Sequence, residues 1–296
     1  MRIVSLLPST TEILFAVGAG PQVVGVTFEC DTPAEARKRS IVSTTAIPEG
    51  LPPHEIDAFV SRAMAAGEDL YHLDGGALSE LDADLVVTQD LCAVCAVDVS
   101  VVDDALAYLG CRAEVLTIDP HCLDEVLTSV LTLGAASGCA DTAATLVGRL
   151  RERLAAVQDS VWGADRPRAL VLEWTDPAFA PGHWVPEMVT VAGGTNALGD
   201  AGEKSVRVTW DAVRDSAPEV IVCAPCGYDL EGSTTLAQAA IASGELPNGI
   251  PVWAVDANAS FARPGPRLVD GVEALAGILH PDRAPAPRAD MARRLR

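Results

Sequence analysis

Lysine is the scarcest charged residue in this chain: Lys38 and Lys204 are the only two among 296 residues. The 21 basic residues are outnumbered by 41 acidic ones, which gives a formal net charge of −20. Such a surface repels a nucleic-acid backbone and an anionic membrane, so we expect neither as a partner. Aromatic residues make up only 4% of the chain, which favours a core of aliphatic side chains. No apolar run approaches the ~20 residues that cross a bilayer.

Several catalytic signatures are also absent from the sequence. It has no nucleophile elbow with a Ser–His–Asp pattern, no HExxH and no GxGxxG. Gly193 and Gly194 precede Thr195, but this stretch lacks the lysine and the spacing of a phosphate-binding loop. Nothing here requires an enzyme, and we expect a binding protein instead.

A targeting segment is likewise not visible at the start of the sequence. The apolar residues of 1–20 are interrupted at 8–12 by PSTTE, which breaks the apolar core that an export signal needs. We therefore expect a cytoplasmic protein, or a periplasmic or extracellular one if an upstream segment is missing. The eight cysteines would then be thiols, metal ligands or redox groups rather than structural disulfides.

The first half of the chain alternates between predicted strands and helices. Short apolar runs at 3–7, 23–26, 84–88 and 114–118 are typical of buried parallel strands. Apolar residues at helical spacing mark helices between them, and Ser9 with Glu12 matches a capping box at the first one. This alternation predicts a parallel sheet covered by helices on both faces.

A long helix then separates two halves. Residues 140–162 contain no proline and carry apolar residues every three or four positions. Strand and helix alternation restarts after it. We therefore predict an α/β protein with two Rossmann-like lobes joined by one long rigid helix: an N-terminal lobe at 1–138, a connecting helix at 139–163, a C-terminal lobe at 164–281 and a disordered tail at 282–296.

Two Cys-x-x-Cys pairs follow predicted strands, one in each half. Because ligands of open α/β sheets bind at the carboxyl ends of strands, the pairs could form one site between the lobes. Tetrathiolate zinc or an iron–sulfur cluster would use such ligands. A redox-active dithiol and coincidental buried thiols are the alternatives. The candidate metal ligands are Cys92, Cys95, Cys223 and Cys226, with Cys30 as a possible fifth.

The segment EWTDPAFAPGHWVPE at 173–187 also follows a predicted strand. Tryptophan and histidine are scarce here, so their clustering predicts the wall of a ligand site, with indoles for stacking and an imidazole that could reach a metal. Alternatively, the tryptophans cover a core and the histidine bonds the backbone. The remaining histidines, including His121, lie outside any cluster. The ligand-binding candidates are Glu173, Trp174, Asp176, His183 and Trp184.

Ser9 and Thr10 are further candidates, at the start of the first helix. Hydroxyls at a helix N-terminus can bind a carboxylate or phosphate. A plain helix cap is the simpler explanation of the same residues.

Several of these segments together resemble a known family. LLPSTTEILFAVG, VVGVT, DLVVTQ, the long central helix and RPGPRLVDGVEALAGILHP are similar to the cobalamin-type periplasmic binding proteins, which belong to the helix-linked substrate-binding proteins of ABC importers. TQDLCAVC, EWTDPAFAPGHWVPE and CAPCG resemble a subset without a signal peptide that is described as cobalamin-binding. The resemblance covers residues 1–281. It implies two α/β lobes joined by a rigid helix, with a ligand held between them.

The resemblance also bears on partners. Transporter relatives dock on permease arginines through one acidic residue in each lobe. Gly75 and Gly76 fall near the first of these positions, and Asp211, a shorter acid, falls at the second, so permease docking is doubtful. We expect a binding protein that holds a corrinoid such as cobalamin, or another metal-containing ligand. The alternative is a cytosolic metalloprotein or redox enzyme with zinc or an iron–sulfur cluster on the cysteine pairs.

Overall fold

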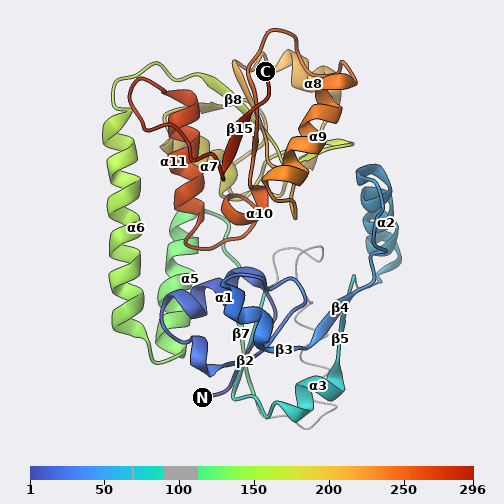
Figure 1. Cartoon of the computed structure of the whole chain (residues 1–296), viewed down its shortest axis with the longest axis vertical. Helices are drawn as coiled ribbons and strands as arrows, with labels where there is room; N and C mark the ends of the chain where they lie inside the picture. Colours follow the sequence, from blue (N-terminus) through green and yellow to red (C-terminus); the bar gives the residue numbers. More distant parts are fainter. Residues whose placement is uncertain (69, 90–112) are drawn as a thin grey trace. The chain divides into compact units, whose positions relative to one another are not determined.

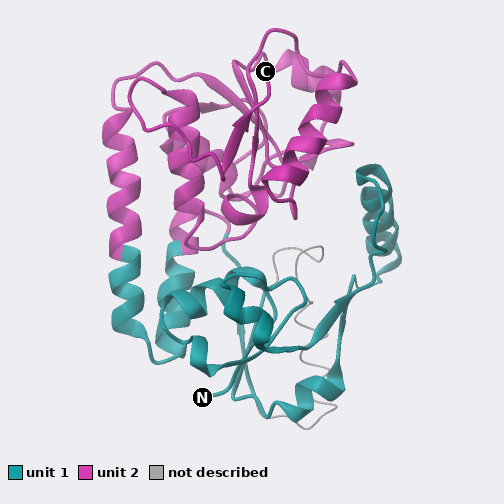
Figure 2. Cartoon of the chain, in the orientation of Figure 1, with its two compact units in different colours: residues 1–120, 127–147 teal, residues 121–126, 148–296 magenta. Residues whose placement is uncertain are grey.

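The computed structural model describes residues 1–68, 70–89 and 113–296. They form two compact units: unit 1 comprises residues 1–120 and 127–147, and unit 2 comprises residues 121–126 and 148–296 (Figure 2). Of the three boundaries between the units, one precedes α5 (Leu123–Ala136), one falls near the start of that helix, and one falls within α6 (Ala140–Ser160). The lobe boundaries expected from the sequence stay a prediction. None of the described helices is both long and apolar enough to span a membrane.

Unit 1 is built on a sheet of five parallel strands in the order β3-β2-β1-β6-β7 (Figure 1). Its buried strands carry continuous β-branched and aliphatic runs, as expected of a sheet covered on both faces. The strands are β1 (Ile3–Ser5), β2 (Val23–Val26), β3 (Ser40–Ile41), β6 (Leu85–Thr88) and β7 (Glu114–Thr117). Among the described residues before α5, the helices are α1 (Pro8–Ala16), η1 (Gly20–Gln22), η2 (Ala34–Lys38), α2 (Pro53–Ala66) and α3 (Gly75–Glu80).

A two-stranded antiparallel ribbon joins α2 to the rest of unit 1. Its strands are β4 (Ser43–Thr45) and β5 (Tyr71–Leu73). Helix α2 ends at Gly67, which adopts a left-handed conformation (φ 68°) that costs glycine little.

Unit 2 repeats the arrangement with a sheet in the order β11-β8-β13-β14-β15. The first four strands are parallel, and β15 is antiparallel to β14. The strands are β8 (Arg168–Leu172), β11 (Thr195–Asn196), β13 (Val220–Cys223), β14 (Val252–Val255) and β15 (Ala292–Arg294). The helices are α7 (Val185–Val191), α8 (Trp210–Asp215), α9 (Leu230–Ala242), α10 (Ala257–Ser260) and α11 (Leu268–Leu279).

A smaller antiparallel sheet of unit 2 follows β8. It pairs β9 (Trp174–Thr175), β10 (Ala178–Ala180) and β12 (Val206–Arg207) in the order β12-β10-β9. It displays the EWTDPAFA segment beyond the carboxyl end of β8.

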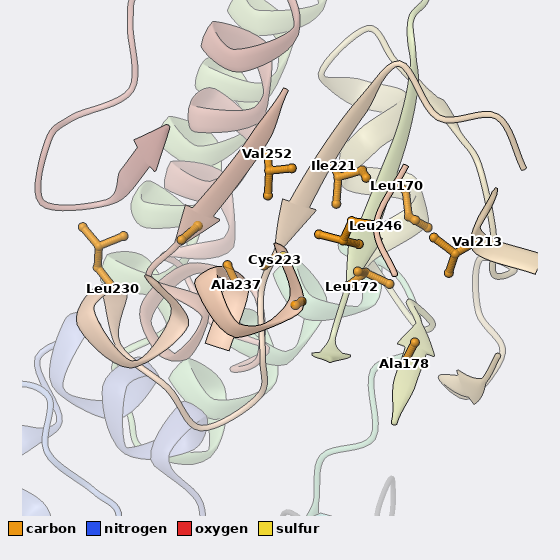
Figure 3. Packing of buried hydrophobic residues seen from close by; sticks show 12 residues of the cluster. Leu170, Leu172, Ala178, Val213, Ile221, Cys223, Leu230, Ala237, Leu246 and Val252 are labelled. Carbon is orange, nitrogen blue, oxygen red and sulfur yellow. The ribbon is translucent and has the colours of Figure 1, made fainter. Parts of the chain in front are cut away.

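The core of unit 2 packs the parallel strands against α9 (Figure 3). Leu170, Ile221 and Val252 on three neighbouring strands are fully buried there. The thiol of Cys223 lies in the same aliphatic cluster. A change of side-chain volume in this core would be felt by its neighbours, because protein interiors are close-packed.

The structure confirms the predicted α/β fold with parallel sheets, but two local predictions differ from it. Residues 282–296 were expected to be a disordered tail, whereas β15 completes the sheet of unit 2 and Arg296 donates to the carbonyls of Ile250 and Pro247. The end of the chain is thus held by edge pairing and by hydrogen bonds to backbone carbonyls. The capping box is also wrong, because α1 begins at Pro8 with Leu7 as its N-cap and no side-chain cap.

Candidate functional site

Two loops of unit 2 lie next to each other where parallel strands end. Strands β8 and β13 pair with Leu172 opposite Cys223, so their carboxyl ends meet at one edge of the sheet. Beyond this edge the Cys226 amide donates to the Glu173 carbonyl over 3.0 Å. The loop that carries Trp174 and the loop that leads to α9 are therefore held together, at the edge where open α/β sheets bind ligands.

An aromatic pair spans these two loops. The rings of Trp174 and Tyr228 lie 5.6 Å apart between centroids and are tilted by 55°, a favourable geometry for aromatic side chains. Both rings are half-buried, and burial raises the pKa of the Tyr228 phenol. The sequence analysis missed Tyr228 because nothing in CAPCGYDL indicates that its ring meets Trp174.

Local contacts hold both rings in place. The indole Nε1 of Trp174 donates to the Asp176 carbonyl over 3.0 Å. A Cβ atom added to Gly232, in the first turn of α9, would lie 2.6 Å from Cδ1 of Tyr228. The glycine thus leaves room for the tyrosine ring. The pair is preorganised, which lowers the entropy cost of stacking a flat ligand on it.

Glu173 and Trp184 make internal contacts that account for both residues. The Glu173 carboxylate accepts hydrogen bonds from the Gly182 amide and the Ser205 hydroxyl. Trp184 is only 4% exposed, and its Nε1 donates to the Phe261 carbonyl over 2.7 Å. The contacts of Trp184 match the alternative in which the tryptophans cover a core. Ligand binding by Glu173 or Trp184 stays a prediction.

His183 occupies an unusual backbone position. Its φ is 51°, and its amide and carbonyl are bonded to Glu203 and Gly202. Its ring lies 5.5 Å from the Trp184 ring and 6.2 Å from the His121 ring, measured between centroids. His121, which the sequence placed outside any cluster, thus joins the predicted wall because the turn before α5 belongs to unit 2.

The cysteines give no support to a shared metal site. Cys92 and Cys95 lie outside the described residues. Cys223 is fully buried, and desolvation raises its pKa to about 12, so the thiolate that zinc or an iron–sulfur cluster needs is strongly disfavoured. Cys226 is exposed instead.

Cys30 belongs to a buried polar network of unit 1. Its Sγ lies 3.1 Å from the Oγ1 atoms of Thr11 and Thr27. No group of three or more His, Cys, Asp or Glu side chains that could hold a metal ion occurs in residues 1–68, 70–89 and 113–296. The zinc and iron–sulfur alternative is therefore not supported.

Ser9 and Thr10 are both buried at the start of α1. The Thr10 Oγ1 is 2.7 Å from the Ser5 Oγ and also reaches the Leu7 carbonyl. The hydroxyl of Thr10 thus has partners inside unit 1. Anion binding by Ser9 and Thr10 stays a prediction.

The two positions implied for permease docking differ from each other. Asp211 in α8 has a side chain that is 84% exposed and pairs with Arg214 over 2.6 Å. Gly75 and Gly76 begin α3. Only unit 2 therefore presents an acidic side chain at the position that the resemblance implies.

Comparison with known proteins agrees with the α/β fold of this chain. The model of the family described as periplasmic binding protein matches residues 3–252. An uncharacterized ABC transporter substrate-binding lipoprotein of Bacillus subtilis is 27% identical over 292 residues, covering 95% of this chain and 80% of that protein. A vitamin B12-binding protein of Yersinia pestis is 25% identical over 224 residues, covering 75% of this chain and 68% of that one.

Solved structures share the fold over nearly the whole chain. A periplasmic heme binding protein from Pseudomonas aeruginosa has a TM-score of 0.71 at 18% identity and covers 98% of this chain and 96% of its own. The periplasmic vitamin B12 binding protein of Vibrio cholerae has a TM-score of 0.68 at 20% identity, with 94% and 96% covered. These likenesses confirm the two-lobe fold with a helix linker that the sequence predicted.

The relatives also correct the expected location. They are named as periplasmic proteins or as a lipoprotein of an ABC transporter. The cytoplasmic location that we expected is therefore wrong, and the relatives point to an extracytoplasmic one. The sequence argument failed because it relied on the first 20 residues alone.

Proposed function

Because this chain belongs to the periplasmic binding protein family, we propose that it binds a corrinoid, a cobalamin-like flat ring with a central metal. Ligand binding of this family's type follows from membership, whereas the corrinoid is our inference. It is supported by the vitamin B12-binding relative from Yersinia pestis. The heme binding protein from Pseudomonas aeruginosa shares the fold, which makes heme the closest alternative ligand.

The observation that carries the proposal is the Trp174–Tyr228 pair. Its two rings are fixed at the edge of the sheet where ligands bind, and they provide apolar surface with polar atoms at the rim. A corrinoid offers a broad, mostly apolar macrocycle edge and polar amide groups around it, which match such a surface. Asp176 is exposed beside Trp174 and is the candidate for an amide group of the ligand.

Titration of the full chain with cyanocobalamin, followed by calorimetry and tryptophan fluorescence, tests this proposal. We expect one site per chain. Replacing both Trp174 and Tyr228 with alanine should weaken binding roughly 10-fold or more, because each ring contact contributes about 0.5–1.5 kcal/mol.

The control is Trp162→Ala, since Trp162 is 84% exposed, more than any other large apolar residue in the part of the chain that the structure describes. Its affinity should equal that of the wild type. Absence of binding to cyanocobalamin, together with tight binding of heme, would mean that the ligand is heme and not a corrinoid. If the Trp174→Ala/Tyr228→Ala variant bound with unchanged affinity, the aromatic pair would not be part of the ligand site.

A further inference from the structure

The Trp174–Tyr228 pair continues into a row of side chains across the small antiparallel sheet of unit 2. Trp174 on β9 lies opposite Phe179 on β10, and Phe179 lies opposite Arg207 on β12. Directly opposite residues of antiparallel strands point to the same face of a sheet, with Cβ atoms about 4.5–5.5 Å apart. The row therefore runs from Tyr228 past two further rings to an arginine.

This row lies on the outer face of the small sheet. Ala178 and Ala180 flank Phe179 in β10 and therefore point to the opposite face. They are 1% and 0% exposed, and Ala178 belongs to the aliphatic core of unit 2. In contrast, Phe179 is half-buried and Arg207 is exposed. The small residues thus pack into the unit, and the rings and the guanidinium lie where a ligand can reach them.

Two kinds of contact hold Arg207 in the row. Its Cζ atom lies 5.7 Å from the centroid of the Phe179 ring, within the range of a cation–π interaction. Strand β12 is fixed beside β10 by its register pairs and by the Val208 amide, which donates to the Ala178 carbonyl over 2.9 Å. A guanidinium carries several N–H donors, and contact with a ring leaves it able to donate to an anion as well.

The charges around the row fit a ligand that has polar amides and one anionic group. Asp176, in the turn between β9 and β10, is exposed and can accept from amides. The Glu173 carboxylate already accepts hydrogen bonds from a backbone amide and a serine hydroxyl. At the other end of the row, Lys204 and Arg207 place two exposed cations beside one exposed acid, Glu203. In a chain with a net charge of −20, an anion needs such a local excess of positive charge.

We propose that Arg207 binds the phosphodiester of a corrinoid whose macrocycle lies against Trp174 and Tyr228. The site would then select cobalamins over corrinoids that lack the nucleotide. This inference rests on the proposed function and names the part of the ligand that the site distinguishes. The phosphodiester is the anionic group at the periphery of a cobalamin, and the planar fork of arginine matches two phosphate oxygens.

The test compares cyanocobalamin with dicyanocobinamide, which has the same macrocycle but no phosphodiester and no nucleotide. Calorimetry is recorded for the full chain, for Arg207→Gln and for Arg149→Gln, a control whose arginine is exposed on α6. Each titration is made at about 0.05 M and about 0.5 M NaCl, because salt screens exposed charges. Circular dichroism checks that the variants are folded.

The wild type and Arg149→Gln should bind cyanocobalamin more tightly than dicyanocobinamide. At low salt Arg207→Gln should bind cyanocobalamin about 10-fold more weakly than the wild type, which corresponds to about 1.4 kcal/mol. The loss should shrink at high salt, and the affinity for dicyanocobinamide should be unchanged. An equal loss of affinity for both ligands would overturn the proposal, because it would not depend on the phosphate.

The same titrations separate this inference from the proposed function. If the wild type and Arg207→Gln bind cyanocobalamin with equal affinity at low salt, the phosphate contact is wrong and the corrinoid proposal stands. If the wild type binds neither corrinoid, the corrinoid proposal fails and the role of Arg207 fails with it.

Discussion

Replacing Trp184 with phenylalanine should destabilise unit 2 without affecting ligand binding. The indole is 4% exposed, and its Nε1 is the donor that reaches the Phe261 carbonyl. Phenylalanine keeps most of the apolar volume but leaves that buried carbonyl without this donor, at a cost of about 1–3 kcal/mol. The smaller ring also leaves a cavity, which adds roughly 1 kcal/mol. We expect a total loss of about 2–4 kcal/mol.

Urea denaturation followed by circular dichroism measures this loss, and Trp162→Phe is the matched control. Because Trp162 is exposed, its replacement should change the free energy of unfolding by less than about 0.5 kcal/mol. Cobalamin affinity is then measured without urea, where both variants are folded. A Trp184→Phe protein of normal stability but reduced affinity would refute our reasoning and place the indole in the ligand site.

Three further predictions concern unit 2. Burial raises the pKa of Cys223 from 9.0 to about 12. The free energy of unfolding, measured relative to Cys223→Ala in urea melts, should therefore be constant below pH 9 and fall by about 1.4 kcal/mol per pH unit from pH 9 toward 12. Gly232→Ala should push the Tyr228 ring aside and weaken cobalamin binding about 2- to 10-fold, whereas Gly148→Ala, which meets open space, should leave affinity unchanged in calorimetry. Arg153→Met removes the ion pairs from α6 to two carboxylates of α11 and should cost about 1 kcal/mol, since the site is partly exposed; a cost that persists unchanged in 1 M salt would contradict an electrostatic origin.

Much of the fold could be predicted because its periodic signals are local. The apolar run at 23–26 is β2, and the long helix expected at 140–162 is α6 (Ala140–Ser160). Such segments show their type without knowledge of their partners. The C-terminal strand could not be predicted in the same way, because β15 forms only through pairing with β14, and its sequence ARR has no strand pattern of its own.

The site was harder to predict because it depends on contacts between distant segments. Trp174 stood out by composition, but its partner Tyr228 lies 54 positions later in a loop without any aromatic pattern. The same holds for His121, whose ring lies near that of His183 because residues 121–126 belong to unit 2 although they are flanked by unit 1 in the sequence. Cys223 shows the opposite error, since a Cys-x-x-Cys spacing cannot tell that one of the two thiols faces an aliphatic core.

Equilibrium binding of cyanocobalamin to the full chain tests the central claim most directly. Calorimetry should give one site per chain, with quenching of tryptophan fluorescence that is lost in the Trp174→Ala/Tyr228→Ala variant. A folded protein that releases no heat and shows no fluorescence change with cyanocobalamin up to millimolar concentration would contradict the claim that this chain holds a corrinoid.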